Sequence, residues 1–164
     1  MNKSKLFSML VGVVVLSAGF SASALAASTA YPGSMCHGYR TSDEANLRHG
    51  YNGEIMNNGT GGSTLDCPLV RSSYPYSGVT MYVKDLSTKG DVTCQIMTRS
   101  ALGSLGSWTN RSSTGTDTAW YGQWLDFGAE TYSYTGYSYF RCYFPATANS
   151  SEYVQITDYY ITAP

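Results

Sequence analysis

Hydrophobic and polar residues alternate along several short segments of this chain, most clearly from residue 137 to residue 144. Side chains on an extended backbone point to opposite faces in turn. One face of this segment carries Ser138, Phe140, Cys142 and Phe144, and the other carries Tyr137, Tyr139, Arg141 and Tyr143. We therefore predict a strand with one side in the protein core and a second, tyrosine-rich side that faces outward.

Similar segments recur between clusters of turn-forming residues, of which Asn57 to Gly62 is the clearest. No long segment has a helical hydrophobic period, although residues 42–47 could form one short helical turn with Ser42 as its N-cap. The strands predicted in this way are residues 51–56, 63–70, 79–85, 91–97, 119–127, 137–144 and 152–161. This organisation predicts an all-β fold, an antiparallel β-sandwich of jelly-roll type with about seven or eight strands.

Two predicted strands carry a local irregularity. Pro68 cannot donate a backbone hydrogen bond, which favours an edge position for residues 63–70. The hydrophobic phase changes within residues 152–161, because Val154 and Ile156 share one phase while Tyr159 and Ile161 share the opposite one. A β-bulge near residues 157–158 would reconcile the two halves.

Two further segments have no clear period. Residues 28–48 predict an irregular N-terminal arm that is anchored by Cys36. Residues 98–117 are rich in serine, glycine and threonine, and they predict either a long loop or a weak strand around Trp108.

The first residues have the organisation of a secretory signal peptide. Basic residues are followed by an apolar run from Leu6 to Phe20 and by the small-residue site Ala24-Leu25-Ala26. The run is short for a membrane span, which needs about 20 apolar residues. We predict a signal peptide over residues 1–26, a single domain over residues 27–164, no membrane span after cleavage, and a secreted or periplasmic location.

The charge balance excludes one class of partner. Removal of Lys3 and Lys5 with the signal peptide leaves 8 of the 10 basic side chains against 11 acidic ones, a formal net charge of −3. A nucleic-acid-binding protein would show a basic patch or stripe instead. We therefore predict no nucleic-acid partner.

The four cysteines, Cys36, Cys67, Cys94 and Cys142, all follow the signal peptide. An even number in an exported chain predicts two disulfides, for which three pairings exist. We favour Cys36 with Cys67 and Cys94 with Cys142. A zinc site is disfavoured because no two cysteines have the short spacing of its ligands.

Five short motifs follow one another in a fixed order from about Cys36 to Ile161. They are Asp66-Cys67-Pro68-Leu69, Val92-Thr93-Cys94-Gln95-Ile96, Leu125-Asp126-Phe127-Gly128, Cys142-Tyr143-Phe144-Pro145 and Tyr159-Tyr160-Ile161. In this order the chain resembles a family of small, uncharacterised secreted bacterial proteins with one domain and four cysteines. The resemblance implies an exported β-domain, and it implies neither an activity nor a site.

The outward aromatic residues carry the strongest indication of function. Trp120, Trp124, Tyr137, Tyr139 and Tyr143 could form an apolar surface of the kind that stacks on sugar rings. Arg141, on the same face of its strand, could bind a hydroxyl, a carboxylate or a phosphate. We predict a non-catalytic domain that binds a polysaccharide or a cell-envelope surface through these six residues. The alternative is that the aromatic residues only stabilise the sheet through cross-strand contacts.

Other functions are less well supported by the sequence. Low charge and an exposed tyrosine-rich sheet could instead serve a structural or adhesive protein that self-associates. Catalysis is disfavoured because His37 and His49 lie in the N-terminal arm and the carboxylates are scattered, with no pair spaced for glycoside hydrolysis. Asp126 and Asp158 are poor candidates for calcium, so we predict neither a metal nor a cofactor.

Overall fold

The computed structural model describes residues 28–70, 76–100, 102, 105–114, 122–130 and 136–162. The predicted signal peptide, the predicted cleavage site and Trp120 lie outside these residues. Among the described residues, no helix is long and apolar enough to cross a membrane.

The described part of the chain contains eleven strands, a short 3₁₀ helix and one turn of α-helix. The elements are β1 (Ser28–Pro32), η1 (Gly33–Met35), β2 (His37–Gly38), α1 (Thr41–Glu44), β3 (Leu47–His49), β4 (Ile55–Asn57), β5 (Ser63–Leu69), β6 (Tyr76–Asp85), β7 (Thr93–Ser100), β8 (Leu105–Ser112), β9 (Gln123–Glu130), β10 (Gly136–Phe144) and β11 (Val154–Thr162). The predicted fold class is confirmed, but the predicted number of strands is wrong. The additional strands are mostly short and lie in the N-terminal part, where two to five residues are too few to show an alternation.

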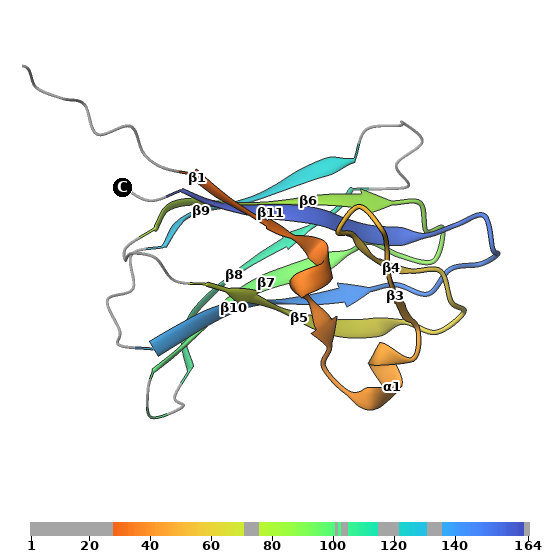
Figure 1. The fold of residues 1–164 in the computed structure, drawn as a ribbon, viewed down its shortest axis with the longest axis horizontal. Coiled ribbons are helices and arrows are strands. Elements are labelled where there is room, and N and C mark those ends of the chain that lie inside the picture. Colours follow the sequence, from red (N-terminus) through yellow and green to blue (C-terminus); the bar gives the residue numbers. More distant parts are fainter. Residues whose placement is uncertain are drawn as a thin grey trace, which may run out of the picture.

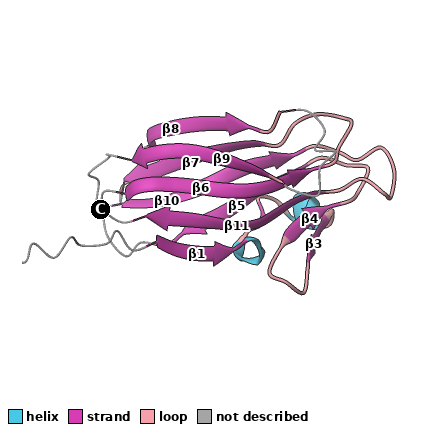
Figure 2. Ribbon diagram, turned by 90° about the horizontal axis from the view of Figure 1, so that it is seen from above, coloured by secondary structure: helices cyan, strands magenta, loops and turns pink. Residues whose placement is uncertain are grey.

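The strands form two sheets that pack face to face as a β-sandwich (Figure 1). Sheet A has the order β3-β4-β11-β6-β9, and β1 also pairs with β11. Sheet B has the order β2-β5-β10-β7-β8. All strand pairs are antiparallel, and from β5 onward the chain changes sheet at every connection except the one between β7 and β8. Figure 2 shows the layered strands from above, with β8 at one side and β1 at the other. This repeated crossing gives the jelly-roll-like arrangement that the sequence predicts.

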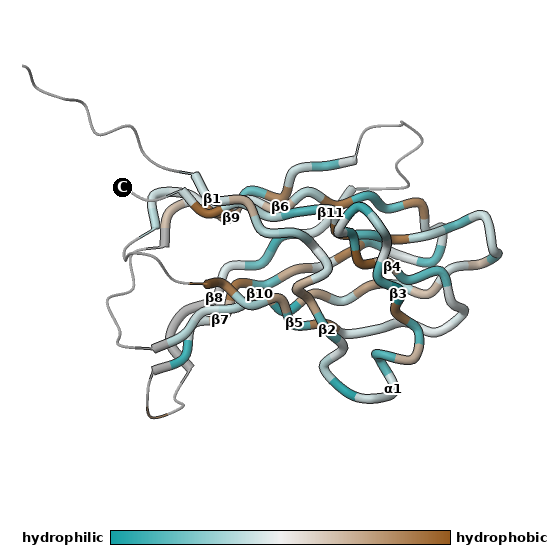
Figure 3. The backbone as a smooth tube through the Cα atoms, viewed as in Figure 1, coloured by the Kyte–Doolittle hydropathy of each residue, from teal (hydrophilic) through white to brown (hydrophobic). Residues whose placement is uncertain are grey.

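The core lies between the sheets and is built from the alternating positions of each long strand. Figure 3 shows hydrophobic and hydrophilic residues alternating along the strands. On β10 the predicted inward residues Ser138, Phe140, Cys142 and Phe144 are all buried. The Phe140 ring contacts Phe127 and Tyr159 of sheet A, with ring centroids 4.9 and 5.5 Å apart. One face of β10 therefore belongs to the core, and its other face is the outer surface of sheet B.

The chain crosses from sheet A to sheet B between β1 and β2. Gly33, in η1, packs so closely on β11 that a Cβ atom there would collide with the backbone carbonyl of Ile156. Immediately afterwards, Cys36 forms a disulfide with Cys67 of β5 across a sequence separation of 31 residues. The crossing segment is thus fixed to one sheet by packing and to the other by a covalent bond.

The second disulfide joins Cys94 of β7 to Cys142 of β10, across 48 residues of sequence. The two residues are direct partners in the antiparallel ladder, so this bond fixes the register of the two strands. Both favoured pairings are therefore confirmed, and both bonds attach to strands of sheet B.

Several smaller predictions have definite outcomes. The register of β11 against β6 shifts between Ile156 and Asp158, which confirms the predicted bulge. The strand that contains Pro68, β5, is next to the edge of sheet B rather than at it, because the two-residue β2 pairs with Leu65 and Asp66 on the side away from β10. For residues 98–117 the sequence predicted either a long loop or a weak strand, and residues 105–112 form the strand β8. The helix begins at Thr41 with Arg40 as its N-cap, so Ser42 is not the cap.

One end of the sandwich is held together by the buried carboxylate of Asp85, the last residue of β6, whose exposure is 0%. Its oxygens accept hydrogen bonds from Ser87 N at 3.0 Å, Val92 N at 3.0 Å and Ser113 Oγ at 2.6 Å. Val92 N also donates to Ser113 Oγ at 2.8 Å. Asp85 thereby connects the end of β6, the start of β7 and the end of β8.

Candidate functional site

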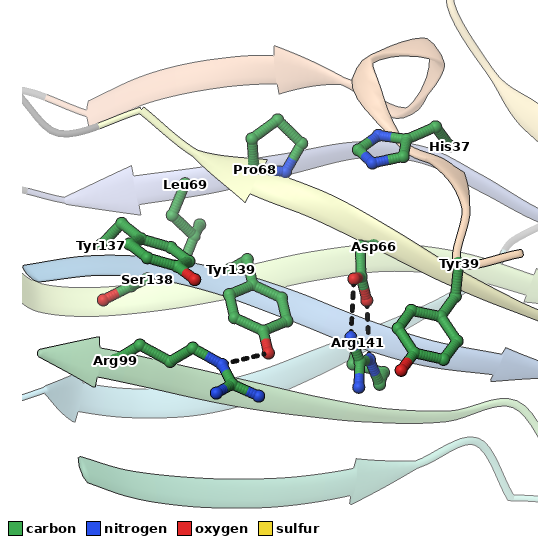
Figure 4. Close-up of a pocket in the computed structure, with 10 residues that line it drawn as sticks. All are labelled: His37, Tyr39, Asp66, Pro68, Leu69, Arg99, Tyr137, Ser138, Tyr139 and Arg141. Carbon is green, nitrogen blue, oxygen red and sulfur yellow. Dashed lines mark hydrogen bonds and ion pairs between the residues drawn. The ribbon is translucent and has the colours of Figure 1, made fainter. Parts of the chain in front are cut away.

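A hollow of about 460 Å³ lies on the outer face of sheet B (Figure 4). The strands β2, β5, β7 and β10 supply most of its lining, because their outward side chains meet there. The side chains that matter most for its chemistry are Tyr39, Asp66, Arg99, Tyr137, Tyr139 and Arg141. The hollow therefore includes three of the six predicted binding residues.

Arg141 and Asp66 form an ion pair at one side of the hollow. The two residues face each other across the β10–β5 ladder, and Arg141 donates from Nε to Oδ1 and from Nη2 to Oδ2, both at 2.8 Å. Their side chains are 25% and 19% exposed, and the bond to Asp66 raises the pKa of Arg141. The guanidinium also lies 3.9 Å from the ring centroid of Tyr39, which is a cation–π distance. Arg141 is thus held rigidly, with its charge balanced by Asp66.

Tyr139 and Tyr137 form a stacked pair beside this ion pair, with ring centroids 5.9 Å apart and ring planes at 26°. Tyr139 lies on the predicted outward face, yet it is only 8% exposed. Its neighbours cover it, because Tyr137 stacks on it and Arg99 donates a hydrogen bond from Nε to its hydroxyl oxygen at 3.1 Å. Tyr137 is 58% exposed, so it offers the accessible ring of the pair.

Tyr143 lies on the same face of β10 but does not line the hollow. It is 48% exposed and packs over Gly62, where an added Cβ atom would lie 2.5 Å from the tyrosine hydroxyl. A ligand that extends from the hollow along β10 would meet this ring next.

Trp124 lies on the opposite side of the sandwich. It belongs to β9 of sheet A, where it is 56% exposed and contacts Tyr82 and Tyr160 with ring centroids 4.9 and 5.4 Å apart. The outward aromatic residues of the sequence are therefore divided between two outer faces. The structure does not bring Trp124 together with the tyrosines of β10.

Sequence reasoning did not identify Tyr39, Asp66 or Arg99 as site residues. A signal for Arg99 was present, because the Cys94–Cys142 pairing places Arg99 directly opposite Tyr137 in the same ladder. The Cys36–Cys67 pairing likewise brings the segment after Cys36 beside Asp66, and His37 is the ladder partner of Asp66. Each disulfide pairing thus sets which residues of the two linked segments lie opposite each other, and in both cases these residues line the hollow.

Within the described residues, no group of three or more histidine, cysteine, aspartate or glutamate side chains is arranged to hold a metal ion. The two aspartates considered for calcium both have local partners. Asp126 Oδ1 accepts a hydrogen bond from Gly128 N at 2.8 Å, and Asp158 Oδ2 accepts one from the Tyr160 hydroxyl at 3.0 Å.

Comparison with known proteins shows a likeness in fold. No protein-family model matches the chain, and no curated protein sequence matches it. The xylan-binding module CBM15 superposes with a TM-score of 0.53 at 15% identity, covering 84% of this chain and 97% of its own. The insecticidal crystal protein Cry2Aa gives 0.54 at 11% identity, covering 83% of this chain and 21% of its own.

A family two carbohydrate esterase from Cellvibrio japonicus gives a TM-score of 0.48 at 8% identity, covering 85% of this chain and 35% of its own. This chain therefore spans only a minor part of the esterase and of the crystal protein. At these identities the matches to the xylan-binding module and the crystal protein show a shared β-sandwich fold alone.

Proposed function

We propose that this protein is an exported, non-catalytic domain that binds a glycan in the hollow on the outer face of sheet B. The observation that carries the proposal is the exposed Tyr137 ring, which stacks on Tyr139 and lies directly opposite Arg99 in the β7–β10 ladder (Figure 4). A sugar ring has an apolar face that can stack on an aromatic ring and a rim of hydroxyl groups that need hydrogen-bond partners. This part of the hollow offers both.

The scaffold supports the same proposal. Tyr137 and Tyr139 belong to a central strand that is paired on both sides and joined to β7 by a disulfide, so the rings are held on a rigid surface. The xylan-binding module has a similar fold over nearly its whole length, and its name records a polysaccharide ligand. The two disulfides are also compatible with the export that the predicted signal peptide implies.

A binding role fits the hollow better than hydrolysis. Glycoside hydrolysis ordinarily requires two carboxyl groups on either side of the scissile bond. Among the described residues that line the hollow, Asp66 is the one carboxylate, and both of its oxygens accept hydrogen bonds from Arg141.

A glycan array with the purified, disulfide-containing protein tests the proposal, followed by titration calorimetry with the best ligand. The Tyr137→Ala variant should bind at least about tenfold more weakly, because loss of a stacking ring removes on the order of 1.5 kcal/mol. Trp124→Ala is the matched control, since it removes an equally exposed aromatic ring from the opposite face. Absence of binding to any glycan, or equal affinities for wild type and Tyr137→Ala, would contradict the proposal.

Self-association is a second candidate function, and the position of Trp124 favours it. Together with Tyr82 and Tyr160, this ring gives sheet A an aromatic patch that a ligand in the hollow would not contact. Such a patch could pack against a second copy. Sedimentation velocity over a range of protein concentrations should then show association that Trp124→Ala abolishes. A protein that stays monomeric at the highest concentration would exclude this role.

A further inference from the structure

We infer that the hollow and Tyr143 together form one elongated site along β10, which binds a linear glycan along its length. This inference rests on the proposed glycan-binding function and names the class of ligand. The ligand is an internal stretch of an extended, unbranched polysaccharide, with several consecutive sugar units in contact with the protein. Within the same function, the alternative is a single terminal sugar that is bound at Tyr137 alone.

The outward side chains of β10 follow one another in a straight row. They are Tyr137, Tyr139, Arg141 and Tyr143, and the ladder to β7 includes all four without a register shift. Side chains on one face of a strand recur at every second residue with a rise of about 3.3 Å per residue, so Tyr137 and Tyr143 lie about 20 Å apart along the strand. One sugar ring is too short to contact both tyrosines, whereas a linear chain of sugars is long enough.

The hollow is elongated in the same direction. Figure 4 shows Tyr137 toward one end of the labelled side chains, Tyr139 in the middle, and the pair of Arg141 and Asp66 toward the other end. Tyr137 is exposed and Tyr139 is buried, so the Tyr139 ring forms the floor of the hollow between Tyr137 and the ion pair. A chain that is stacked on Tyr137 can therefore continue along the strand above this floor.

Groups that bind hydroxyls lie between the two exposed rings. Arg141 donates to Asp66 through Nε and Nη2, and its Nη1 group is not part of this pair. Gln95 of β7 lies directly opposite Arg141 in the ladder. It is half-buried and belongs to the outer face, because its neighbours Cys94 and Ile96 are buried in the core. A guanidinium donates hydrogen bonds and an amide both donates and accepts them, so the middle of the row suits the hydroxyl groups of sugars that are not stacked on a ring.

Tyr143 ends the row as a second exposed ring in a defined position. A Cβ atom added at Gly62 would lie 2.5 Å from the Tyr143 hydroxyl and 3.0 Å from Cζ, so the tyrosine packs closely on the chain there. The ladder partners of Tyr143 are Thr64 of β5 and Thr93 of β7, which share the outer face and carry hydroxyl groups. Tyr143 therefore offers a second stacking surface with hydrogen-bonding groups beside it, which only a chain that reaches beyond the hollow would use.

Titration calorimetry with oligosaccharides of increasing length tests the inference. The probes are cello-, xylo- and manno-oligosaccharides, each from the trisaccharide to the hexasaccharide, because their β-1,4 linkages keep the chain extended. The trisaccharide is too short to contact both rings, and the hexasaccharide is long enough. In at least one series the affinity should rise with length, and the hexasaccharide should bind at least about tenfold more tightly than the trisaccharide because it gains a second stacking contact.

Variants at the two rings assign the dependence on length. Tyr143→Ala should weaken hexasaccharide binding by about tenfold and leave trisaccharide binding within about twofold, because only the longer chain reaches this ring. Tyr143→Phe keeps the aromatic ring and should retain most of the affinity, whereas Tyr137→Ala should weaken the binding of both lengths. Tyr51→Ala is the matched control, because Tyr51 is a fully exposed tyrosine between β3 and β4 of sheet A, and it should change neither affinity.

The outcomes separate the inference from the proposed function. An affinity that does not change with length would overturn the inference and leave the proposed glycan binding intact. A Tyr143→Ala variant that binds the hexasaccharide as tightly as the wild type, or that weakens both lengths equally, would also contradict the inference. Binding to none of the oligosaccharides would overturn it as well, and the glycan array would then decide the proposed function by itself.

Discussion

Replacement of Asp85 by alanine is expected to weaken the fold more than the loss of any exposed carboxylate. The side chain is completely buried, and three donors from separate segments converge on it. In Asp85→Ala the amide of Val92 still donates to Ser113 Oγ, but the amide of Ser87 and the hydroxyl of Ser113 lose the acceptor that the carboxylate provides.

The magnitude follows from these contacts. Each hydrogen bond to a charged group contributes about 1.5–3 kcal/mol, and a buried donor without an acceptor costs about 1–3 kcal/mol. Removal of the buried charge also recovers part of its desolvation cost, so the terms do not simply add. We expect a net loss of about 3–4 kcal/mol in the free energy of unfolding, which is large for one residue. Asp85→Asn keeps the shape and one acceptor oxygen, and it should lose about half as much.

Urea unfolding followed by tryptophan fluorescence measures this loss. With a slope of about 2 kcal/mol/M, the midpoint of Asp85→Ala should fall by about 1.5–2 M. Asp91→Ala, an exposed carboxylate just before β7, is the control and should move the midpoint by less than about 0.3 M. If Asp85→Ala and Asp91→Ala unfold at the same urea concentration, the account of the buried cluster is wrong.

Three further predictions concern other parts of the sandwich. Gly33→Ala should lower the melting temperature by more than about 8 °C, because the added Cβ would collide with the backbone of β11. Gly78→Ala is the control, since the nearest atom to its Cβ is 3.8 Å away, and it should change the melting temperature by only a few degrees. Equal shifts for the two variants would contradict the packing argument. Backbone donors, chiefly the amide of residue 148, lower the pKa of Glu152. The stabilisation by ionised Glu152 is therefore complete at neutral pH and is lost as the pH falls below about 4.5. Glu152→Gln should flatten this acid limb in a plot of the free energy of unfolding against pH, and an acid limb that the substitution leaves unchanged would contradict the role of Glu152. Replacing Cys94 and Cys142 by alanine should cost about 4 kcal/mol in urea unfolding, and a loss below about 1 kcal/mol would not fit the loop-entropy model.

The sequence predicted best those features that depend on the local alternation of a long strand. The two faces of β10, the bulge in β11 and both disulfide pairings agree with the structure. The first two depend on side-chain phase within one strand, and three of the four cysteines, Cys67, Cys94 and Cys142, lie at predicted core-facing positions of strands. By contrast, β1, β2 and β3 were not predicted, because two to five residues carry too little pattern to be found, and β4 (Ile55–Asn57) only overlaps the end of the strand predicted over residues 51–56.

The arrangement of the candidate site was harder to predict, because an outward phase does not say which outer face a residue joins. Trp124 and Tyr137 both point away from the core, yet they belong to different sheets. The alternation of side chains also does not predict whether an outward side chain is covered by its neighbours. Tyr139 points to the outer face but is buried there by Tyr137 and Arg99. Such coverage depends on long side chains of adjacent strands, and therefore on a register that strand alternation alone leaves open.

The disulfide between β7 and β10 limits how this site could change during evolution. Tyr137 and Arg99 are paired five positions beyond the bonded cysteines, in the same ladder. Insertion or deletion of one residue between Tyr137 and Cys142 would turn Tyr137 toward the core and separate it from Arg99, because side chains alternate with a period of two. We therefore expect homologues with other ligand preferences to differ here by substitution at the outward positions, and to accept changes in length only outside the segment between the site and the disulfide.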